Sequence, residues 1–380
     1  MKKILDKILY KDSHFYASFP SAVNLANNEI ILMFRRARDF RWLLDDDDEL
    51  TKELRELVDH IDSRSHLVTI KLDQNLNLIS NEKILSIDPE AADQDASLLL
   101  LKSGSLMLSS FAWYPLPSRL AKSLRQSGVA IRGHFEDSGC YFILWGGYTR
   151  YSKDFGKNWS DHQYLPPMPQ ASDIIPGKRK SCGGPTRGQA VEMGNDILLP
   201  VYNYLTSHTS GSCHLYISTD QGKSWTYRSM IAFDPEQNIH FNEPSLLHCK
   251  GDKIIAFMRT FNADDHLYTA TSHDRGVSWE KWQKRKEIVG HPIHPLRLKD
   301  GRVFISYGYR HEPYGIRARL MDKNANDFIG EELIIREDGA SADLGYPWAT
   351  QLNNGDILVV YYFTEHDGIR HISSSLISLD

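Results

Sequence analysis

The chain has 380 residues, of which 41% are hydrophobic and 11% aromatic, and its formal net charge is −5. This charge offers no basic surface for nucleic acid, so we expect no nucleic-acid partner. No apolar stretch is long enough to span a membrane, and Asp6 and Lys7 interrupt the start of the chain where a signal peptide would be apolar. The four cysteines lack metal-ligand spacing. We therefore expect a cytoplasmic protein with reduced thiols, no metal and no cofactor.

The two ends of the chain are predicted to pair with each other. Residues 3–10 would supply a strand beside residues 369–378 and close a ring of blades, which removes free sheet edges.

Two insertions interrupt the repeat that lies between these ends. Residues 45–62 have aliphatic side chains at helical spacing after an acidic start, and predict a short helix in blade one. Residues 115–134 are predicted to form a long polar loop. Each insertion is either a solvated surface segment or a lid over the propeller mouth.

Six pairs of short aliphatic segments, each joined by a turn rich in Gly, Asn or Asp, follow one another along the chain. Each pair has the signature of a β-hairpin. The last four recur at roughly 50-residue spacing, about the length of a four-stranded propeller blade. The first two pairs lie at residues 22–32 and 98–108. The turn and second segment of the other four lie at residues 195–199, 251–255, 300–305 and 354–359. They predict an all-β fold, with residues 1–380 forming a single six-bladed β-propeller domain.

Three octapeptides share the pattern S-x-D-x-G-x-x-W, at residues 152–159, 218–225 and 272–279. The Asp is suited to accept hydrogen bonds from a tight turn, the Gly can adopt the positive φ that such a turn needs, and the Trp buries a large ring beneath it. Residues 72–77 are interpreted as a degenerate copy in blade one, and blades five and six are expected to have lost the pattern. We expect these turns to be structural and to lie on the outer rim.

Aligning the hairpins gives one entry position per blade, just before the strand that lines the axis. These positions carry carboxylates, an Arg, histidines and a Tyr, which together predict a binding mouth. Each residue also has a structural alternative, as a strand cap, an ion-pair partner or a packed aromatic. In blade order the positions are 18–20, Asp95, Arg187, Glu243, 291–294, and Asp343 with Tyr346.

With these hairpins and octapeptides the chain resembles the sialidase (neuraminidase) superfamily over essentially its whole length. The octapeptides resemble the Asp boxes, or BNR repeats, of that family. Residues 242–259 resemble its fourth-blade motif, in which a Glu opens the strand and an Arg closes the hairpin. Residues 313–320 resemble the stretch that holds another substrate-binding Arg, and residues 343–347 fall where the family places its catalytic Tyr.

The resemblance implies an exo-acting, retaining glycoside hydrolase whose partner is a carbohydrate. A sialidase attacks an anomeric carbon that bears a carboxylate, which would repel a carboxylate nucleophile, so a neutral Tyr is used. Tyr346 would be that nucleophile and Glu243 its base, because a free Tyr has a pKa near 10 and needs one. Arg259 and Arg317 would bind the substrate carboxylate through forked hydrogen bonds.

The general acid is left open by the sequence. Asp39 is the nearest candidate in the loop where the family's acid is expected, the acidic run at residues 45–48 is next, and Asp95 is a further catalytic candidate. The remaining predicted substrate-binding residues are Arg35, Arg36, Arg187, His294 and Asp343.

The chain departs from the family at the start of blade one. Sialidases have an Arg-Ile-Pro motif there, whose Arg completes a carboxylate-binding triad, whereas this chain has Ser18-Phe19-Pro20. Arg35 or Arg36 is expected either to substitute for that Arg or to keep the role of a second blade-one Arg. The predicted substrate is therefore a terminal sialic-acid-like or other acidic sugar. The alternatives are a glycosidase or lyase acting on a different polysaccharide, or a non-catalytic glycan-binding propeller.

Overall fold

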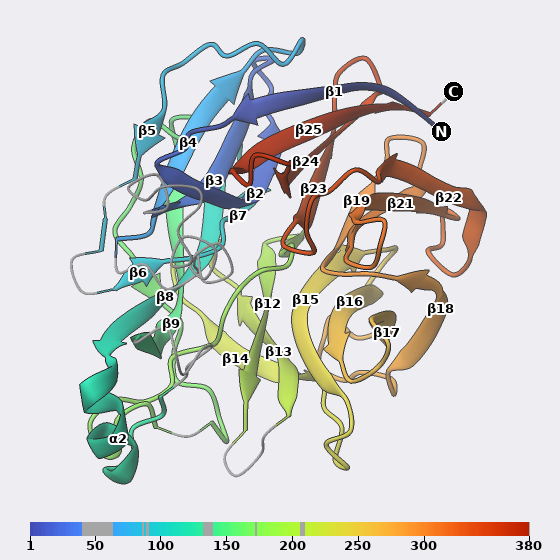
Figure 1. Cartoon of the computed structure of the whole chain (residues 1–380). Helices are drawn as coiled ribbons and strands as arrows, with labels where there is room; N and C mark the ends of the chain where they lie inside the picture. Colours follow the sequence, from blue (N-terminus) through green and yellow to red (C-terminus); the bar gives the residue numbers. More distant parts are fainter. Residues whose placement is uncertain are drawn as a thin grey trace.

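The computed structural model describes residues 1–39, 64–85, 87–88, 91–131, 140–171, 173–205 and 210–379. Within these ranges the chain forms six antiparallel sheets arranged as the blades of a β-propeller, and one short helix (Figure 1). The predicted helix at residues 45–62 lies outside the described residues. In the described part, no helix combines the length and the apolar character needed to cross a membrane, and Cys182, Cys213 and Cys249 are free thiols.

Each of the first three blades is built from strands that follow one another in the sequence. Blade one consists of β2 (Phe15–Asn24), β3 (Ile30–Arg38), β4 (His66–Leu72) and β5 (Lys83–Ile84). Blade two consists of β6 (Ala92–Asp93), β7 (Ser97–Leu100), β8 (Leu106–Pro117), β9 (Cys140–Ser152) and β10 (Gln163–Tyr164). Blade three consists of β11 (Val191–Met193), β12 (Asp196–Tyr204), β13 (Gly211–Ser218) and β14 (Thr226–Ala232).

The remaining three blades repeat this order, and the last one takes its outer strand from the start of the chain. Blade four consists of β15 (His240–His248), β16 (Ile254–Phe261), β17 (His266–Ser272) and β18 (Gln283–Val289). Blade five consists of β19 (Ile293–Arg297), β20 (Val303–Tyr309), β21 (Gly315–Met321) and β22 (Phe328–Arg336). Blade six consists of β23 (Gly345–Gln351), β24 (Ile357–Thr364), β25 (Arg370–Ser378) and β1 (Lys2–Tyr10). Each of the six predicted hairpins is formed by two neighbouring strands of one blade: β7 and β8 in blade two, and the first two strands in every other blade.

The hydrophobic core is a ring of clusters, each shared by two neighbouring blades. Successive side chains of a strand point to opposite faces of its sheet, and here both faces meet another blade. Strands such as β3 and β24 therefore read as nearly continuous aliphatic and aromatic runs, and their residues are almost all buried. This explains why the hairpins appear in the sequence as apolar runs and not as an alternating pattern.

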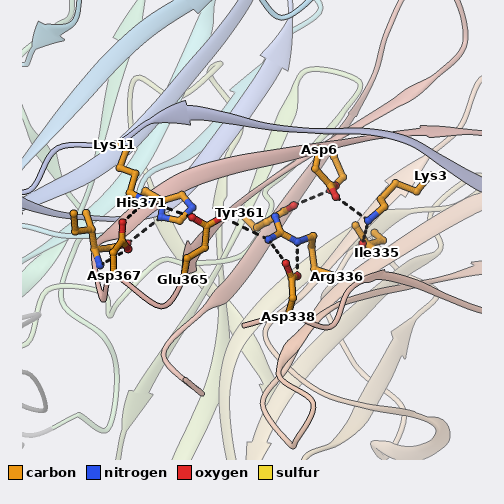
Figure 2. Close-up of polar contacts among 12 residues, drawn as sticks. Lys3, Asp6, Lys11, Ile335, Arg336, Asp338, Tyr361, Glu365, Asp367 and His371 are labelled. Carbon is orange, nitrogen blue, oxygen red and sulfur yellow. Dashed lines mark hydrogen bonds and ion pairs between the residues drawn. The ribbon is translucent and has the colours of Figure 1, made fainter. Parts of the chain in front are cut away.

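The predicted closure of the ring is confirmed, because β1 pairs antiparallel with β25. A layer of polar contacts lies along this seam (Figure 2). The Asp6 carboxylate accepts a hydrogen bond from Ser375 at 2.6 Å and pairs with Lys3 at 2.7 Å, and Lys11 pairs with Asp367 at 2.6 Å. Since β1 completes blade six, both ends of the chain are held in one sheet.

The three octapeptides form equivalent turns between the last two strands of blades two, three and four. In each, the Asp carboxylate accepts a hydrogen bond from the backbone N–H four positions on, at 2.8–2.9 Å, and the Gly has a positive φ. Trp225 donates its indole N–H to Thr149 of the preceding blade at 3.2 Å. Asp73 makes the same backbone bond at 2.8 Å in blade one, and Asp322 makes it at 2.7 Å in blade five. Blade five thus keeps the Asp turn although its Ser and Trp are gone.

We predict that these turns make the protein sensitive to acid. The residue four positions on donates hydrogen bonds through its backbone and its side chain, and these bonds lower the pKa of Asp154, Asp220 and Asp274 from 3.8 to about 2. Because the folded pKa is depressed, this stabilisation is present above about pH 4 and is lost as the pH falls toward 2. The triple Asp→Asn variant should melt at a lower temperature than the wild type at pH 7, and the gap should close toward pH 2 in circular-dichroism melts. A gap that does not change with pH would contradict this explanation, and Asp161→Asn, at an exposed site, is the control.

The prediction of a loop at residues 115–134 is wrong in its first half. Strand β8 continues to Pro117, and α2 follows at Ser118–Gln126. Ala121 and Leu124, spaced by three residues, pack against Tyr141 and neighbouring apolar side chains of the long β8–β9 hairpin. This contact gives the helix an apolar face to bury, which its polar composition did not reveal.

Candidate active site

The axial strands of blades one, four and six share one irregularity. Each has a bulge at the same register position, and the residue at its centre has a positive φ. These residues are Phe19 (53°), Glu243 (44°) and Tyr346 (49°), and each is followed by proline. A positive φ is costly for such side chains, and a bulge re-aims the side chain that it carries. Three blades thus use the same strained geometry to present Phe19, Glu243 and Tyr346 at equivalent positions.

Tyr346, Glu243 and Arg259 form one buried cluster. The Tyr346 hydroxyl donates a hydrogen bond of 2.5 Å to Glu243 Oε1. Arg259 Nη1 donates to Glu243 Oε2 and to the Tyr346 oxygen, both at 3.0 Å. All three side chains are more than nine-tenths buried. The predicted nucleophile, base and arginine of blades four and six therefore converge.

The protonation states of this cluster follow from its burial and charges. Burial, followed by the negative charge of Glu243, raises the pKa of Tyr346 far above its ordinary value, so the phenol is protonated. Burial alone would raise the pKa of Glu243, but the charge of Arg259 and the hydrogen bonds to the carboxylate outweigh it, and the pKa is lowered. The pair therefore consists of a neutral phenol whose proton already points at an ionised carboxylate. Such a pair can pass the phenolic proton to Glu243 as the Tyr346 oxygen attacks an electrophile.

Arg187 holds the backbone around Tyr346. Its Nη2 donates to the backbone oxygen of Tyr346 at 3.0 Å and to that of Pro20 at 3.5 Å, and its Nη1 donates to that of Ala96 at 3.4 Å. Its guanidinium carbon lies 4.9 Å from the centre of the Tyr346 ring. Arg187, which the sequence suggested as a sugar contact, thus joins the axial strands of three blades from within the propeller.

Asp95 lies beside this arginine, with Oδ2 3.6 Å from Arg187 Nε. Burial raises the pKa of Asp95 to about 7, against the lowering effect of the Arg187 charge. Asp95 can therefore be protonated near neutral pH, as a general acid requires.

We predict that Asp95 makes stability fall as the pH rises. Its folded pKa of about 7 lies above its ordinary value of 3.8, so folding favours the protonated form and the stabilisation is lost between about pH 4 and pH 7. The free energy of unfolding of the wild type, minus that of Asp95→Asn, should decline across this window by at most about 1.4 kcal/mol per pH unit. Urea unfolding at several pH values measures this difference. A difference that stays constant from pH 4 to pH 7 would show that Asp95 does not titrate there.

The structure adds Arg310, which the sequence analysis missed. Its guanidinium carbon lies 5.4 Å from the centre of the Tyr346 ring. It donates to the Leu344 backbone oxygen at 3.1 Å and to the Tyr362 hydroxyl at 3.0 Å. Arg310 directly follows the second strand of blade five, as Arg259 lies near the end of the second strand of blade four. This repeated position was the signal that could have found it.

Arg317, predicted to bind the substrate, is not brought to this cluster. It lies on β21, the third strand of blade five, and donates to the Arg336 backbone oxygen at 2.5 Å. Its guanidinium carbon lies 4.6 Å from the ring centre of Tyr309, and its Nε lies 3.8 Å from Glu332. The sequence resemblance selected an arginine one strand farther from the axis than Arg310.

Asp343 supports the site indirectly. Its carboxylate accepts hydrogen bonds from the hydroxyls of Tyr16 and Tyr362 and from Arg370 Nε, at 2.9–3.0 Å. Since Tyr362 also accepts from Arg310, Asp343 is linked to that arginine through one tyrosine.

Blade one presents Phe19 to the cluster. The Phe19 ring lies 4.6 Å from the Tyr346 ring and 5.8 Å from the guanidinium carbon of Arg35. Ser18 pairs in register with Arg35, and both side chains are fully buried. Arg36 has its contacts at the outer part of the blade, where Nη1 lies 2.9 Å from Glu82.

Asp39 and His294 are the two other predicted residues. Asp39 is buried and donates its backbone N–H to the His14 oxygen at 2.9 Å. It is followed by residues 40–63, so the acidic run at 45–48 lies outside the described residues.

His294 accepts a hydrogen bond from the Ala349 N–H at 3.1 Å, and burial lowers its pKa well below the ordinary value. It lines a cavity of about 10 Å³, room for one water, together with Arg187, Glu243 and other axial residues. Among the described residues, no group of three or more His, Cys, Asp or Glu side chains is placed to hold a metal ion.

The six blades and their repeated Asp turns define a six-bladed β-propeller. A family model described as a BNR repeat-like domain matches residues 138–359, more than half of the chain. The chain therefore belongs to the BNR repeat-like family.

Solved structures support this assignment at the level of fold. A protein of unknown function from Dyadobacter fermentans DSM 18053 is 33% identical, with a TM-score of 0.87 over 100% of this chain and 99% of that chain. The NanB sialidase of Streptococcus pneumoniae is 13% identical, with a TM-score of 0.64 over 98% of this chain and 70% of that chain. An α-L-arabinanase of Penicillium chrysogenum is 11% identical, with a TM-score of 0.60 over 100% and 99% of the two chains. The fold thus resembles that of glycoside hydrolases with different substrates.

Proposed function

We propose that the protein is an exo-acting glycoside hydrolase that removes a terminal sugar with retention of configuration. The observation that carries the proposal is the 2.5 Å hydrogen bond from the Tyr346 hydroxyl to Glu243, with Arg259 bonded to both. A buried phenol held against an ionised carboxylate is the arrangement that a tyrosine nucleophile needs.

The first step forms a covalent intermediate. The Tyr346 oxygen bonds to the anomeric carbon, the phenolic proton passes to Glu243, and the glycosidic C–O bond breaks. The leaving oxygen takes a proton from a second carboxyl group, for which Asp39 and Asp95 are the candidates among the described residues.

The second step releases the sugar. Water attacks the anomeric carbon, the bond to the Tyr346 oxygen breaks, and Glu243 returns its proton to that oxygen. The second carboxylate takes the proton of the water, so the enzyme returns to its starting state. Arg259 stabilises the ionised partner of the pair at each stage because it contacts both oxygens.

The preferred substrate class is an acidic sugar of sialic-acid type. A neutral nucleophile avoids the repulsion that a carboxylate would meet from an anionic sugar, and Arg259 and Arg310 place two positive charges beside Tyr346. A neutral terminal sugar, such as a pentofuranose of an arabinan, is the second candidate. The observation that favours it is blade one, where buried Ser18 occupies the position of the family's third arginine and the next residue, Phe19, packs an apolar ring against Tyr346.

The test is a panel of aryl α-sialosides, aryl uronides and aryl α-L-arabinofuranosides, assayed with the wild type and with Tyr346→Phe and Glu243→Gln. Turnover of the sialoside that both changes remove would support the first candidate. Turnover of only the arabinoside or a uronide would reject sialic acid and support a hydrolase, or for a uronide a lyase, on another polysaccharide. Saturable glycan binding without any turnover would reject the enzyme and leave a glycan-binding propeller.

A further inference from the structure

Strand β16 leads outward from the catalytic cluster to an exposed aromatic ring. Arg259 and Phe261 are two positions apart on this strand, so their side chains point to the same face of the sheet. The guanidinium carbon of Arg259 lies 4.4 Å from the centre of the Phe261 ring. Arg259 therefore contacts Tyr346 and Glu243 on its inner side and Phe261 on its outer side. Phe261 is 40% exposed, so the ring remains open to solvent beside the buried cluster.

A row of hydrogen-bonding groups lies beside this ring. The Asp265 carboxylate is contacted by His291 Nε2 at 3.2 Å and by His311 Nε2 at 3.1 Å. The ring of His291 lies 6.3 Å from that of Phe261. His291 is buried, and burial together with the charge of Arg259 lowers its pKa to about 4, so it is neutral near pH 7. Asp265 and His311 remain partly exposed, at 29% and 47% of their side chains.

The turn that carries Asp265 has a defined backbone conformation. Asn262, Asp264 and Asp265 all have a positive φ, at 61°, 54° and 53°. The N–H of Gly290, in the link between blades four and five, donates to the Asp265 backbone oxygen at 2.8 Å and fixes the turn. Asn and Asp tolerate a positive φ better than other side chains, so the turn holds Asp265 in a defined position.

We propose that Phe261, Asp265 and His311 form a subsite for the sugar next to the one that is cleaved. A sugar ring has an apolar C–H face that packs on an aromatic side chain, and hydroxyl groups at its edge that bond to carboxylates and imidazoles. The aromatic ring and the hydrogen-bonding groups are both present here, and Arg259 lies between them and the Tyr346–Glu243 pair. This inference rests on the proposed function and narrows it, because the substrate is then an oligosaccharide chain and not a glycoside of a small alcohol.

The test compares leaving groups with and without a second ring. Two substrate pairs are used: 3′-sialyllactose with sialyl fluoride, and arabinobiose with arabinofuranosyl fluoride. Fluoride carries no sugar for the subsite to hold. Phe261→Ala should lower kcat/KM for the hydrolysed oligosaccharide about tenfold, and leave that for the matching fluoride within about twofold. Phe261→Trp should keep the wild-type ratio of kcat/KM between oligosaccharide and fluoride. His311→Ala, like Phe261→Ala, should lower that ratio.

The matched control is Phe155→Ala, which removes another phenylalanine, 39% exposed, from the octapeptide turn of blade two. This variant should leave kcat/KM unchanged for both the oligosaccharide and the fluoride. An equal loss for oligosaccharide and fluoride in Phe261→Ala, or no loss for either, would overturn the subsite. If neither pair is hydrolysed, the proposed function fails independently. Calorimetric titration of both oligosaccharides then decides the subsite, which is supported if Phe261→Ala weakens binding and Phe155→Ala does not, and rejected otherwise.

Discussion

Tyr346→Phe is expected to lower kcat by about 10³-fold or more while the protein remains folded. The change removes only the hydroxyl, so no oxygen remains to attack the anomeric carbon, and the covalent route is closed. The Phe side chain keeps the ring contacts with Phe19 and with the guanidinium groups of Arg187 and Arg310. Steady-state kinetics on the hydrolysed substrate, with a thermal melt of the same sample, measures both effects.

The stability cost of Tyr346→Phe should be modest. Glu243 loses the 2.5 Å hydrogen bond but keeps Arg259, so the loss is about 1–3 kcal/mol. Tyr362→Phe is a suitable control, because it removes another buried hydroxyl, one that is bonded to Asp343 and Arg310 and not to Glu243. Retention of more than about a tenth of the wild-type kcat in Tyr346→Phe would show that Tyr346 is not the nucleophile.

Removing Glu243 is expected to damage both stability and activity. In Glu243→Ala the buried Arg259 loses its carboxylate partner, and an uncompensated buried charge of this kind costs about 3–5 kcal/mol. Glu243→Gln keeps the shape and a hydrogen-bonding oxygen, so its cost should be smaller. Both variants should lose about 10²- to 10⁴-fold in kcat, because neither can accept the phenolic proton.

A double-mutant cycle separates these two effects. Glu243→Ala combined with Arg259→Met removes both charges. The double variant should therefore lose less free energy of unfolding than the two single variants lose together, while its activity stays low. Urea unfolding measures the free energies. Additive losses would mean that the 3.0 Å contact between Glu243 and Arg259 contributes little to folding.

The fold was predictable because its signals are local. A hairpin needs two apolar runs and a turn, and the octapeptide needs an Asp and a Gly at fixed spacing, so each is visible within a few dozen residues. Regular spacing of these units indicated six blades, and residues 3–10 were correctly predicted to pair with the C-terminal strand. Helix α2 was missed since its helical face is defined only by contact with the β8–β9 hairpin.

The site was predictable only where a residue occupies an aligned strand position. Glu243 and Tyr346 lie at the centre of equivalent bulges, and Arg259 pairs in register with the residue before Glu243. Arg317 was selected because residues 313–320 resemble a family motif, whereas Arg310 lies outside that stretch, directly after the end of β20. Which arginine faces the Tyr346 ring depends on the direction of a side chain, and that is a property of the packed blade.

The sequence by itself indicated six blades and their turns, because short-range periodicity encodes both, and its resemblance to the sialidase superfamily singled out Tyr346, Glu243 and Arg259. Only the tertiary structure decided which of these groups touch, that Arg187 and Asp343 act from behind the cluster, and that Phe19 packs against the Tyr346 ring. The physical reason is that the site is assembled from residues more than 100 positions apart, as with Glu243 and Tyr346. Distances and pKa shifts across the propeller axis arise only when six blades close around it.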